Sequence, residues 1–171
     1  KFYLVQDFEP DFYAASSASA LADQTYRLGI PGIVNTPGLA SVYRSYGNSA
    51  VELTPAVDRN IYSPPATPSN GASDRPVKIV FYGRPGTARN AFGLGVSALY
   101  LVMDKFGSEV EIVSVGEDFS VRQFGQQGWL KNAGRLPSPE AVADLYRSAD
   151  IGFVLMFSKH PSYQPFEYMA T

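Results

Sequence analysis

Uninterrupted apolar runs are the feature that most limits the fold of this chain. In its second half, VKIVFY (77–82), VEIVSVG (110–116) and DIGFVLMF (150–157) are predominantly apolar along their whole length. Parallel strands that are covered on both faces have this pattern, whereas the strands of half-exposed antiparallel sheets alternate between apolar and polar residues. We therefore expect these runs to be buried parallel strands.

Segments with helical signals separate these runs. Asn90 is a suitable N-cap for a helix over 91–106, and Ser138 is a suitable N-cap for a helix over 138–149. The remaining elements expected in this half are a short strand within 129–136 and a helix from about Pro165. Alternation of strands and helices predicts parallel βαβ units.

The first half of the chain repeats the alternation. Strands are predicted at 2–5, 32–36 and 50–54, with helices at 17–28 and 37–47. A Pro- and Ser-rich stretch then offers almost nothing to bury, which is typical of a linker. We therefore predict two α/β domains, at 1–62 and 76–171, joined by a linker at 63–75.

Composition excludes several classes of protein. The net charge of -2 and the sequence pI near 5.4 argue against a nucleic-acid partner, which would favour a basic surface. The chain has no cysteine, which excludes disulfides, cysteine-ligated zinc and a thiol nucleophile, and fits a reducing, cytoplasmic compartment. The single histidine, His160, excludes a His-rich metal site. No apolar run reaches the ~18–20 residues of a membrane-spanning helix.

The ends of the sequence carry an expectation of their own. Lys1 stands directly before an apolar strand, and Thr171 lies inside a helical pattern. Natural domains rarely begin and end in this way. We expect the chain to be part of a longer protein, with its second domain truncated, and to be inactive alone.

A turn rich in Gly, Pro and Arg follows the strand predicted at 77–82. It reads GRPGTARN and leads into a helix, which is where open α/β sheets bind ligands. Gly83 and Gly86 allow close approach of the backbone, while Arg84 and Arg89 are cations suited to phosphate. The turn therefore predicts an anion site, and the alternative is a solvated turn with two surface arginines.

A second glycine motif, GLGVSA (93–98), matches the G-x-G-x-x-A pattern of dinucleotide sites. It lies inside the predicted helix, whereas the pattern works at a strand-to-helix turn where glycines approach a pyrophosphate. Dinucleotide binding is therefore disfavoured, and we interpret Gly93 and Gly95 as positions of close helix packing.

Polar residues also follow the last apolar run, in HPSYQPFEYM (160–169). Glu167 either accepts a hydrogen bond from a ribose hydroxyl or complements the dipole at the start of a helix. Tyr163 is either a stacking or hydrogen-bonding group or part of the packing. His160 fits a loop position as well as a ligand contact.

The first predicted strand is followed by an acidic segment, QDFEPDFY (6–13). Asp7, Glu9 and Asp11 could hold a metal, although no calcium-loop pattern follows them. They could equally bind sugar hydroxyls or form a solvated acidic turn. The hydroxyl-binding interpretation is the one that we prefer.

Placed in this order, the motifs resemble those of bacterial GT-B glycosyltransferases, and most closely the WsaF-like rhamnosyltransferases related to the large retaining family 4. The similarity covers most of the chain, in VQDFEPDFY, TYRLGIPGIVNTPGLA, PAVDRNIYSP, FYGRPGTARNAFGLGVSAL, DLYRSADIGFVLMFS and HPSYQPFEYMA. The resemblance implies two facing Rossmann-like domains, with a nucleotide-sugar bound by the second and PAVDRNIYSP leaving the first.

The resemblance also implies roles for the cations. Arg84 corresponds to the family's diphosphate-binding arginine, beside Gly83, and Arg89 lies near the second cation of that turn. Arg135, in NAGRLP, stands where a basic group near the phosphates is expected. Cations and a helix N-terminus would stabilise the charge that develops on a leaving diphosphate.

The remaining roles concern the sugar and its acceptor. Glu167 corresponds to the second glutamate of the family's E-x7-E element, which holds the nucleotide ribose, and Tyr163 would line the same pocket. Lys159 stands in place of the first glutamate, so no acceptor for the sugar hydroxyls is assigned there. We expect catalytic roles for Arg84 and Glu167, and for Asp7, which would orient the sugar or the acceptor.

The function implied by the resemblance is transfer of a sugar, with retention, from a nucleotide-sugar such as dTDP-L-rhamnose to a bacterial surface glycan. The resemblance implies no metal and no cofactor beyond the donor. The acceptor would be a glycan or lipid-linked glycan, and the full-length protein would work at the inner face of the membrane. The alternatives are another GT-B enzyme, such as an epimerase, and a nucleotide-sugar-binding or assembly domain without transfer activity.

Overall fold

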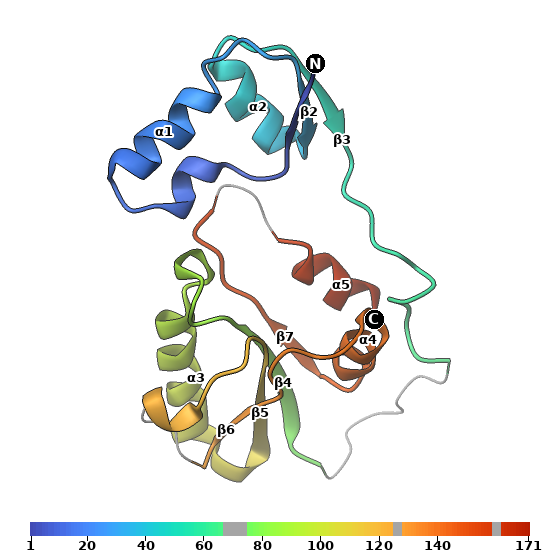
Figure 1. Ribbon diagram of the computed structural model, residues 1–171. Coiled ribbons are helices and arrows are strands. Elements are labelled where there is room, and N and C mark those ends of the chain that lie inside the picture. The colour runs from blue at the N-terminus through green and yellow to red at the C-terminus, as the bar shows by residue number, and fades with distance from the viewer. Residues whose placement is uncertain (67–74, 125–127, 159–161) are drawn as a thin grey trace. The chain divides into compact units, whose positions relative to one another are not determined.

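The computed structural model describes residues 1–66, 75–124, 128–158 and 162–171. Contacts divide the chain into two compact units, which are coloured along the sequence in Figure 1. The first unit comprises Lys1–Ala56 with Met156–Ser162, and the second comprises Val57–Leu155 with Tyr163–Thr171. The predicted linker lies largely outside the described residues, so the predicted boundaries stay a prediction. Residues 57–62, which we expected in the first domain, pack with the second unit.

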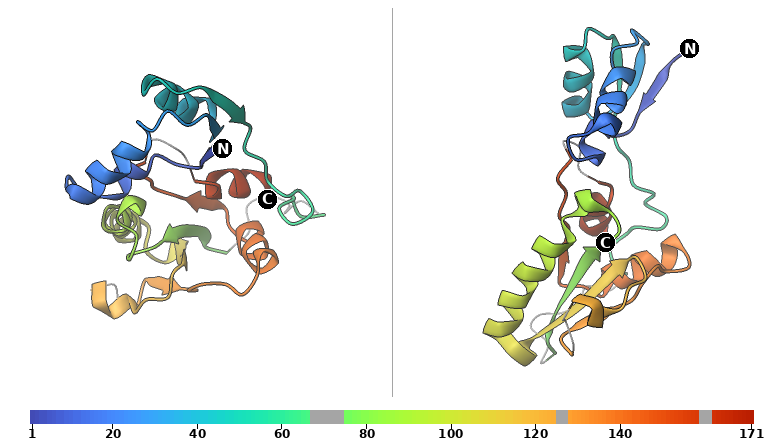
Figure 2. Two further views of the ribbon diagram at one scale, coloured as in Figure 1. Left: turned by 45° about the horizontal axis from the view of Figure 1, so that its top comes forward. Right: turned by 60° about the vertical axis from the view of Figure 1, so that its left-hand side comes forward.

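The first unit is a parallel sheet with helices on one side (Figure 2). Its strands are β1 (Tyr3–Val5), β2 (Gly32–Asn35) and β3 (Ala50–Leu53), in the order β1-β2-β3. Its helices are η1 (Glu9–Phe12), α1 (Ser17–Thr25) and α2 (Pro37–Ser45). The strands and helices expected from the sequence are therefore present, with small differences at their ends.

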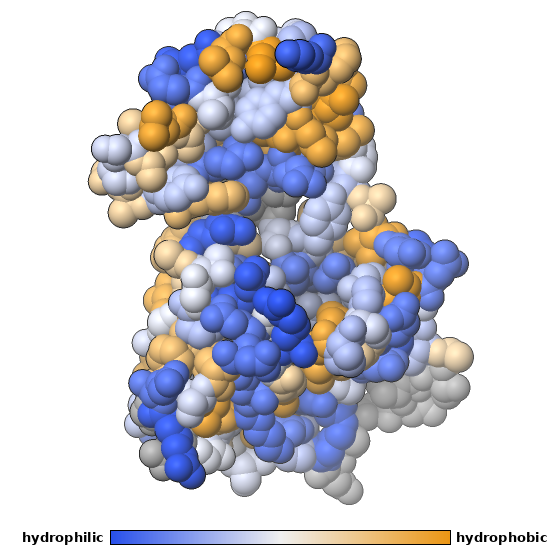
Figure 3. Space-filling view, in the orientation of Figure 1, coloured by the Kyte–Doolittle hydropathy of each residue, from blue (hydrophilic) through white to orange (hydrophobic). Residues whose placement is uncertain are grey.

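Only one face of this sheet is covered by the described residues. Val5 and Val34 point into a core with Tyr26 and Tyr43, and all four are fully buried. Successive side chains of a strand point to opposite faces, and Val51 accordingly lies on the surface with 65% of its area exposed. Figure 3 shows apolar residues gathered on the surface over β3 and its neighbours. Among the described residues, this sheet is therefore covered on one face, whereas the apolar runs of 77–157 predict strands covered on both faces in the second unit.

The second unit contains a four-stranded parallel sheet in the order β6-β5-β4-β7. Its strands are β4 (Val77–Gly83), β5 (Val110–Gly116), β6 (Leu130–Asn132) and β7 (Ile151–Phe153). Its helices are η2 (Ala88–Asn90), α3 (Phe92–Phe106), η3 (Gly107–Glu109), η4 (Val121–Phe124), α4 (Pro139–Arg147) and α5 (Gln164–Ala170). Both sheets are parallel and both units are mixed α/β, so the predicted Rossmann-like fold class is confirmed.

Here both faces of the sheet are covered. Phe81 of β4 packs in a core with Val96 and Leu99 of α3, while its neighbour Val80 packs in a second core with Tyr146 of α4. Phe81 and Val80 are fully buried. The apolar side chains of β4 are therefore buried on both faces of the sheet, as the sequence predicts.

Two local expectations are wrong. The last strand covers only Ile151–Phe153 instead of 150–157, and Ile151 is 48% exposed. It pairs with β4 alone at the edge of the described sheet, so few of its residues can be covered. Asn90 is not the N-cap of α3: it lies buried inside η2, and Ala91 precedes the helix in the left-handed region, with φ 49°.

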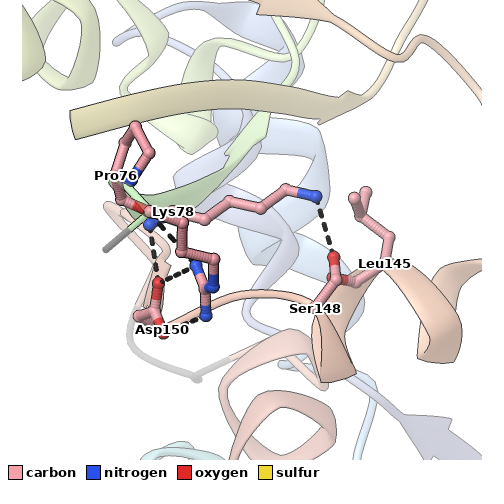
Figure 4. A network of polar contacts seen from close by, with 6 residues as sticks. Pro76, Lys78, Leu145, Ser148 and Asp150 are labelled. Atoms are coloured by element: carbon pink, nitrogen blue, oxygen red, sulfur yellow. Dashed lines mark hydrogen bonds and ion pairs between the residues drawn. The ribbon is translucent and has the colours of Figure 1, made fainter. Parts of the chain in front are cut away.

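Ion pairs and hydrogen bonds join the beginning of β4 to the beginning of β7 (Figure 4). The Asp150 carboxylate accepts a 2.7 Å hydrogen bond from the backbone N–H of Lys78 and a bidentate pair of 2.7 Å contacts from Arg75. The Lys78 ammonium reaches Ser148 Oγ at 2.8 Å, just beyond α4. The Arg75 guanidinium holds the pKa of Asp150 below its usual value. These contacts fix where the edge strand joins the sheet.

The glycines of GLGVSA behave differently from each other. A Cβ atom on Gly95 would lie 2.5 Å from Cζ of Phe81, so α3 packs directly against β4 at this point. Close packing is confirmed for Gly95. A Cβ atom on Gly93 would meet nothing within 4 Å, so close packing is wrong for Gly93.

This difference gives a matched pair of variants. Gly95→Ala forces its methyl group into the ring of Phe81, which the core holds, and we expect it to lower the free energy of unfolding by about 1–3 kcal/mol. Gly93→Ala meets open space and improves helix propensity, so it should leave stability unchanged or raise it by up to ~1 kcal/mol. Urea unfolding followed by circular dichroism measures both. Equal stability of the two variants would show that the close approach of α3 to Phe81 does not require glycine at position 95.

Candidate functional site

The carboxyl edge of the four-stranded sheet contains a reversal in strand order. The chain passes from β4 to β5 and on to β6, and it then returns to the opposite side of β4 to form β7. Open α/β sheets bind ligands at the carboxyl ends of the strands where the order reverses in this way. The turn after β4 and the helix after β7, which the sequence analysis singled out, both start at this edge.

A cavity of about 310 Å³ lies at this edge, within the second unit. This volume is in the lower part of the range found for small-molecule sites. Its lining consists of Tyr62, Tyr82, Val115, Gly116, Arg135, Leu136, Pro137, Ser138, Pro139, Val142, Tyr146, Gln164 and Glu167. Glu167 and Arg135, which the sequence analysis assigned to one donor site, therefore line the same cavity.

Glu167 is the half-buried carboxylate of the cavity, and it lies in the first turn of α5. Burial raises its pKa above the usual value, while a hydrogen bond with Tyr62 acts in the opposite direction. Burial and the adjacent carboxylate together raise the pKa of Tyr62 to about 12. The phenol of Tyr62 therefore keeps its proton beside the carboxylate of Glu167.

Aromatic rings form the wall next to this pair. Tyr62 and Tyr146 lie with their ring centroids 6.3 Å apart, and Tyr146 stacks on Tyr168 with a centroid separation of 3.8 Å. Burial raises the pKa of both Tyr146 and Tyr168. The hydroxyl of Tyr168 donates to the carbonyl oxygen of Val80 at 3.0 Å, which fixes α5 to β4. The rings thus present an uncharged wall beside one carboxylate.

Arg135 follows β6 in a loop that hydrogen bonds hold in place. Gly134, with φ +67°, donates to Oδ1 of Asn132 at 2.9 Å and accepts from the N–H of Gly116 at 2.9 Å. The backbone N–H of Arg135 donates to Oδ1 of Asp118 at 3.3 Å. The loop is therefore fixed, and it places Arg135 in the lining of the cavity.

Arg84 lies next to the cavity, because it contacts two of the lining residues, Tyr82 and Gly116. Its Nη1 donates to the hydroxyl of Tyr82 at 3.4 Å. A Cβ atom on Gly116 would lie 3.1 Å from Cγ of Arg84, so the arginine passes close over Gly116, which has φ +122°. Nε of Arg84 is buried and has no hydrogen-bond partner among the described residues. Such a donor is suited to an anionic ligand.

Contacts within the protein explain why glycine occupies positions 83 and 86 of the turn. A Cβ atom on Gly83 would lie 2.1 Å from Oγ of Ser114, so Gly83 lets β4 pack against β5. The N–H of Gly86 donates to both carboxylate oxygens of Glu117, at 3.1 and 3.2 Å. In this structure the backbone at Gly86 approaches a side-chain carboxylate, and a donor-binding role for Gly83 stays a prediction.

The remaining predicted residues lie apart from the cavity lining. Arg89 belongs to η2, and Tyr163 caps α5 with 41% of its area exposed. Asp7 belongs to the first unit, where its Oδ1 accepts a 2.8 Å hydrogen bond from the N–H of Phe8. Tyr26 donates to Glu9, which ties the acidic segment to α1. Lys159 and His160 lie outside the described residues.

Sequence reasoning missed some residues of the site. The sequence places Tyr62 only in the stretch that leaves the first domain, and Tyr82 only in a strand. Among these residues, the sequence could have indicated Gly116. It is a glycine at the end of a predicted strand, and such a glycine often marks a close approach of another group to the backbone; in the structure it pairs with Gly83. Tyr62 had no such signal, because its contact with Glu167 joins segments far apart in the sequence.

The described residues contain neither a cluster suited to a metal ion nor a helix suited to a membrane. No group of three or more His, Asp or Glu side chains within the described ranges is arranged to hold a metal ion. No helix there combines the length and the apolar character that crossing a bilayer requires.

Comparison with known proteins agrees with the resemblance found in the sequence. The chain is 44% identical over 169 residues to the O-antigen biosynthesis protein RfbC of Myxococcus xanthus, a match that covers 98% of the chain and 13% of that protein. Residues 1–36 match the family model of the WsaF N-terminal domain. Residues 77–171, more than half of the chain, match the model of the WsaF C-terminal domain. The chain therefore belongs to the WsaF family.

Proposed function

We propose that the second unit binds the nucleotide-sugar donor of a glycosyltransferase that acts in polysaccharide biosynthesis. The observation that carries this proposal is the cavity at the carboxyl edge of the sheet, which both Glu167 and Arg135 line. Membership of the WsaF family and the O-antigen biosynthesis relative support the same function.

The cavity suits a nucleoside. The carboxylate of Glu167 is an acceptor for a hydroxyl group of the nucleoside sugar, and burial strengthens such a hydrogen bond. Tyr62, Tyr82 and Tyr146 offer ring surface on which a flat base can pack. The lining also includes Ser138, the N-cap residue of α4.

The arginines suit the diphosphate. Arg135 lines the cavity, and Arg84 lies beside it with a buried donor that has no partner among the described residues. Breaking the bond between sugar and phosphate leaves negative charge on the diphosphate, and cations fixed in advance stabilise that charge as it develops. In this proposal Arg84 acts directly on the leaving group, and Arg89 is a second cation of the same turn.

We further propose dTDP-L-rhamnose as the donor, transferred with retention of configuration. The leaving phosphate would help to deprotonate the acceptor hydroxyl, and Asp7 would orient the sugar or the acceptor. The acceptor is a surface glycan, free or lipid-linked, and the full-length protein would reach it at the inner face of the membrane. Calorimetry with dTDP, UDP and GDP, followed by a donor panel on the full-length protein, tests the nucleotide and the sugar.

Comparison of dTDP with thymidine separates the role of Arg84 in phosphate binding from the role of the cavity in nucleoside binding. Arg84→Ala should weaken dTDP binding by about 10- to 100-fold, because a charged hydrogen bond to phosphate is lost, while thymidine binding stays within about twofold. Arg122→Ala, which removes an exposed arginine of η4, is the matched control and should change neither. Calorimetry of the full chain measures dTDP, and chemical-shift titration measures thymidine. An unchanged affinity for dTDP would return Arg84 to the solvated-turn alternative.

The raised pKa of Glu167 predicts a pH dependence. The ionised carboxylate is the better acceptor, so thymidine affinity should increase as the pH rises through the pKa of Glu167 and decrease below it. Because burial raises that pKa, the midpoint should lie above the 4.5 of an ordinary glutamate. Glu167→Gln should bind thymidine more weakly and without this pH dependence. A flat profile in the unmodified chain would exclude Glu167 from the nucleoside site.

A further inference from the structure

A carboxylate of the protein itself lies in the turn after β4. Both oxygens of Glu117 accept hydrogen bonds from the backbone N–H of Gly86, at 3.1 and 3.2 Å. A Cβ atom on Gly86 would lie 2.7 Å from Oε1 of Glu117, so the carboxylate lies directly against the backbone of the turn. One hydrogen-bond donor of the turn is therefore already occupied by an anion.

The pairing of β4 with β5 brings Glu117 to this turn. Gly83 ends β4 and pairs with Gly116, which ends β5, so Arg84 and Glu117 are the first residues of two neighbouring loops. A 3.1 Å hydrogen bond from the N–H of Thr87 to the carbonyl oxygen of Arg84 closes the turn. The closed turn holds its backbone against the loop that Glu117 begins.

The guanidinium of Arg84 does not neutralise this carboxylate. Nε of Arg84 is buried and has no hydrogen-bond partner among the described residues, while its Nη1 donates to the hydroxyl of Tyr82 at 3.4 Å. Among the same residues, the ion pairs do not include one between Arg84 and Glu117. A diphosphate that binds Arg84 therefore also meets the negative charge of Glu117.

We propose that Glu117 competes with the phosphate groups of the nucleotide for the N–H of Gly86, and that it limits the affinity of the site for the diphosphate. This role rests on the proposed function, which assigns the diphosphate to Arg84. Carboxylate and phosphate oxygens accept the same charge-assisted hydrogen bond from a backbone N–H, and two anions close together repel each other.

The competition has a consequence for the end of the reaction. Glu117 is only partly buried, so its carboxylate can turn toward water when a phosphate oxygen takes the N–H of Gly86. When the nucleoside diphosphate product leaves, the carboxylate returns to the N–H and replaces the lost hydrogen bond. Glu117 thus weakens binding of the product and favours its release.

Glu117→Gln tests the competition, because glutamine keeps the size of the side chain and is a weaker, uncharged acceptor. The affinity for dTDP should rise about five- to tenfold, and the affinity for thymidine, which has no phosphate, should stay within about twofold. Calorimetry measures dTDP, and chemical-shift titration measures thymidine. Glu109→Gln is the matched control, since it removes the same charge from an exposed glutamate just before the opposite end of β5, and it should change neither affinity.

Glu117→Asp separates exchange at Gly86 from a general effect of charge. Aspartate keeps the negative charge but is shorter by one methylene group, so its carboxylate should lose the N–H of Gly86. We expect the affinity for dTDP to rise about threefold in this variant. An unchanged affinity in Glu117→Asp, together with tighter binding by Glu117→Gln, would reduce the role of Glu117 to remote charge and overturn the proposal.

The amide of Gly86 gives a readout that does not depend on binding. Without nucleotide, its proton signal in NMR spectra should move upfield in both variants of Glu117, because a hydrogen bond to a carboxylate is lost, and should stay in place in Glu109→Gln. In the unmodified chain, dTDP should shift this signal and thymidine should not.

Inorganic pyrophosphate repeats the comparison without a nucleoside. If dTDP binds to none of the variants, the proposed function fails, and pyrophosphate still tests the competition at Gly86. Tighter binding of pyrophosphate by Glu117→Gln than by the unmodified chain would support the competition. Equal or weaker binding of both anions by folded Glu117→Gln would overturn the inference.

Discussion

The parallel register of β4 and β5 is the constraint on which the candidate site depends. These strands pair over seven positions, from Val77 with Val110 to Gly83 with Gly116, so they end at the same level. Gly83 has no side chain, which leaves room for the buried hydroxyl of Ser114. The two loops that follow therefore start side by side, with Arg84 passing over Gly116.

Hydrogen bonds hold one part of the site in place, and aromatic stacking holds another. Hydrogen bonds to Asp118 and Asn132 fix the loop of Arg135, and the stacking of Tyr146 on Tyr168 fixes α5. A side chain that must meet a ligand at a set distance needs such support, because its own rotamers are otherwise free. The hydrogen bonds around Arg135 therefore support its loop, and Arg135 and Glu167 both line the cavity.

Charges are distributed unevenly around the cavity. One half-buried carboxylate, Glu167, lies among phenols that keep their protons, while Arg84 lies in the turn after β4 and contacts Tyr82 of the lining. A ligand with a hydroxyl-bearing part and an anionic part matches this separation. Glu117, whose carboxylate accepts from Gly86, adds a negative charge to the same turn and helps to set its shape.

Sequence patterns determined the parallel α/β fold, because continuous apolar runs between capped helices leave few other ways to bury them. They also placed Arg84, Arg135 and Glu167 after strands, at one edge of one sheet. The shortness of β7, and the face of the first sheet that no described residue covers, depended on which neighbours each strand finds, and no local pattern records those neighbours. Only the tertiary structure brought Tyr62 to Glu167, because that contact spans most of the second unit and is created by packing.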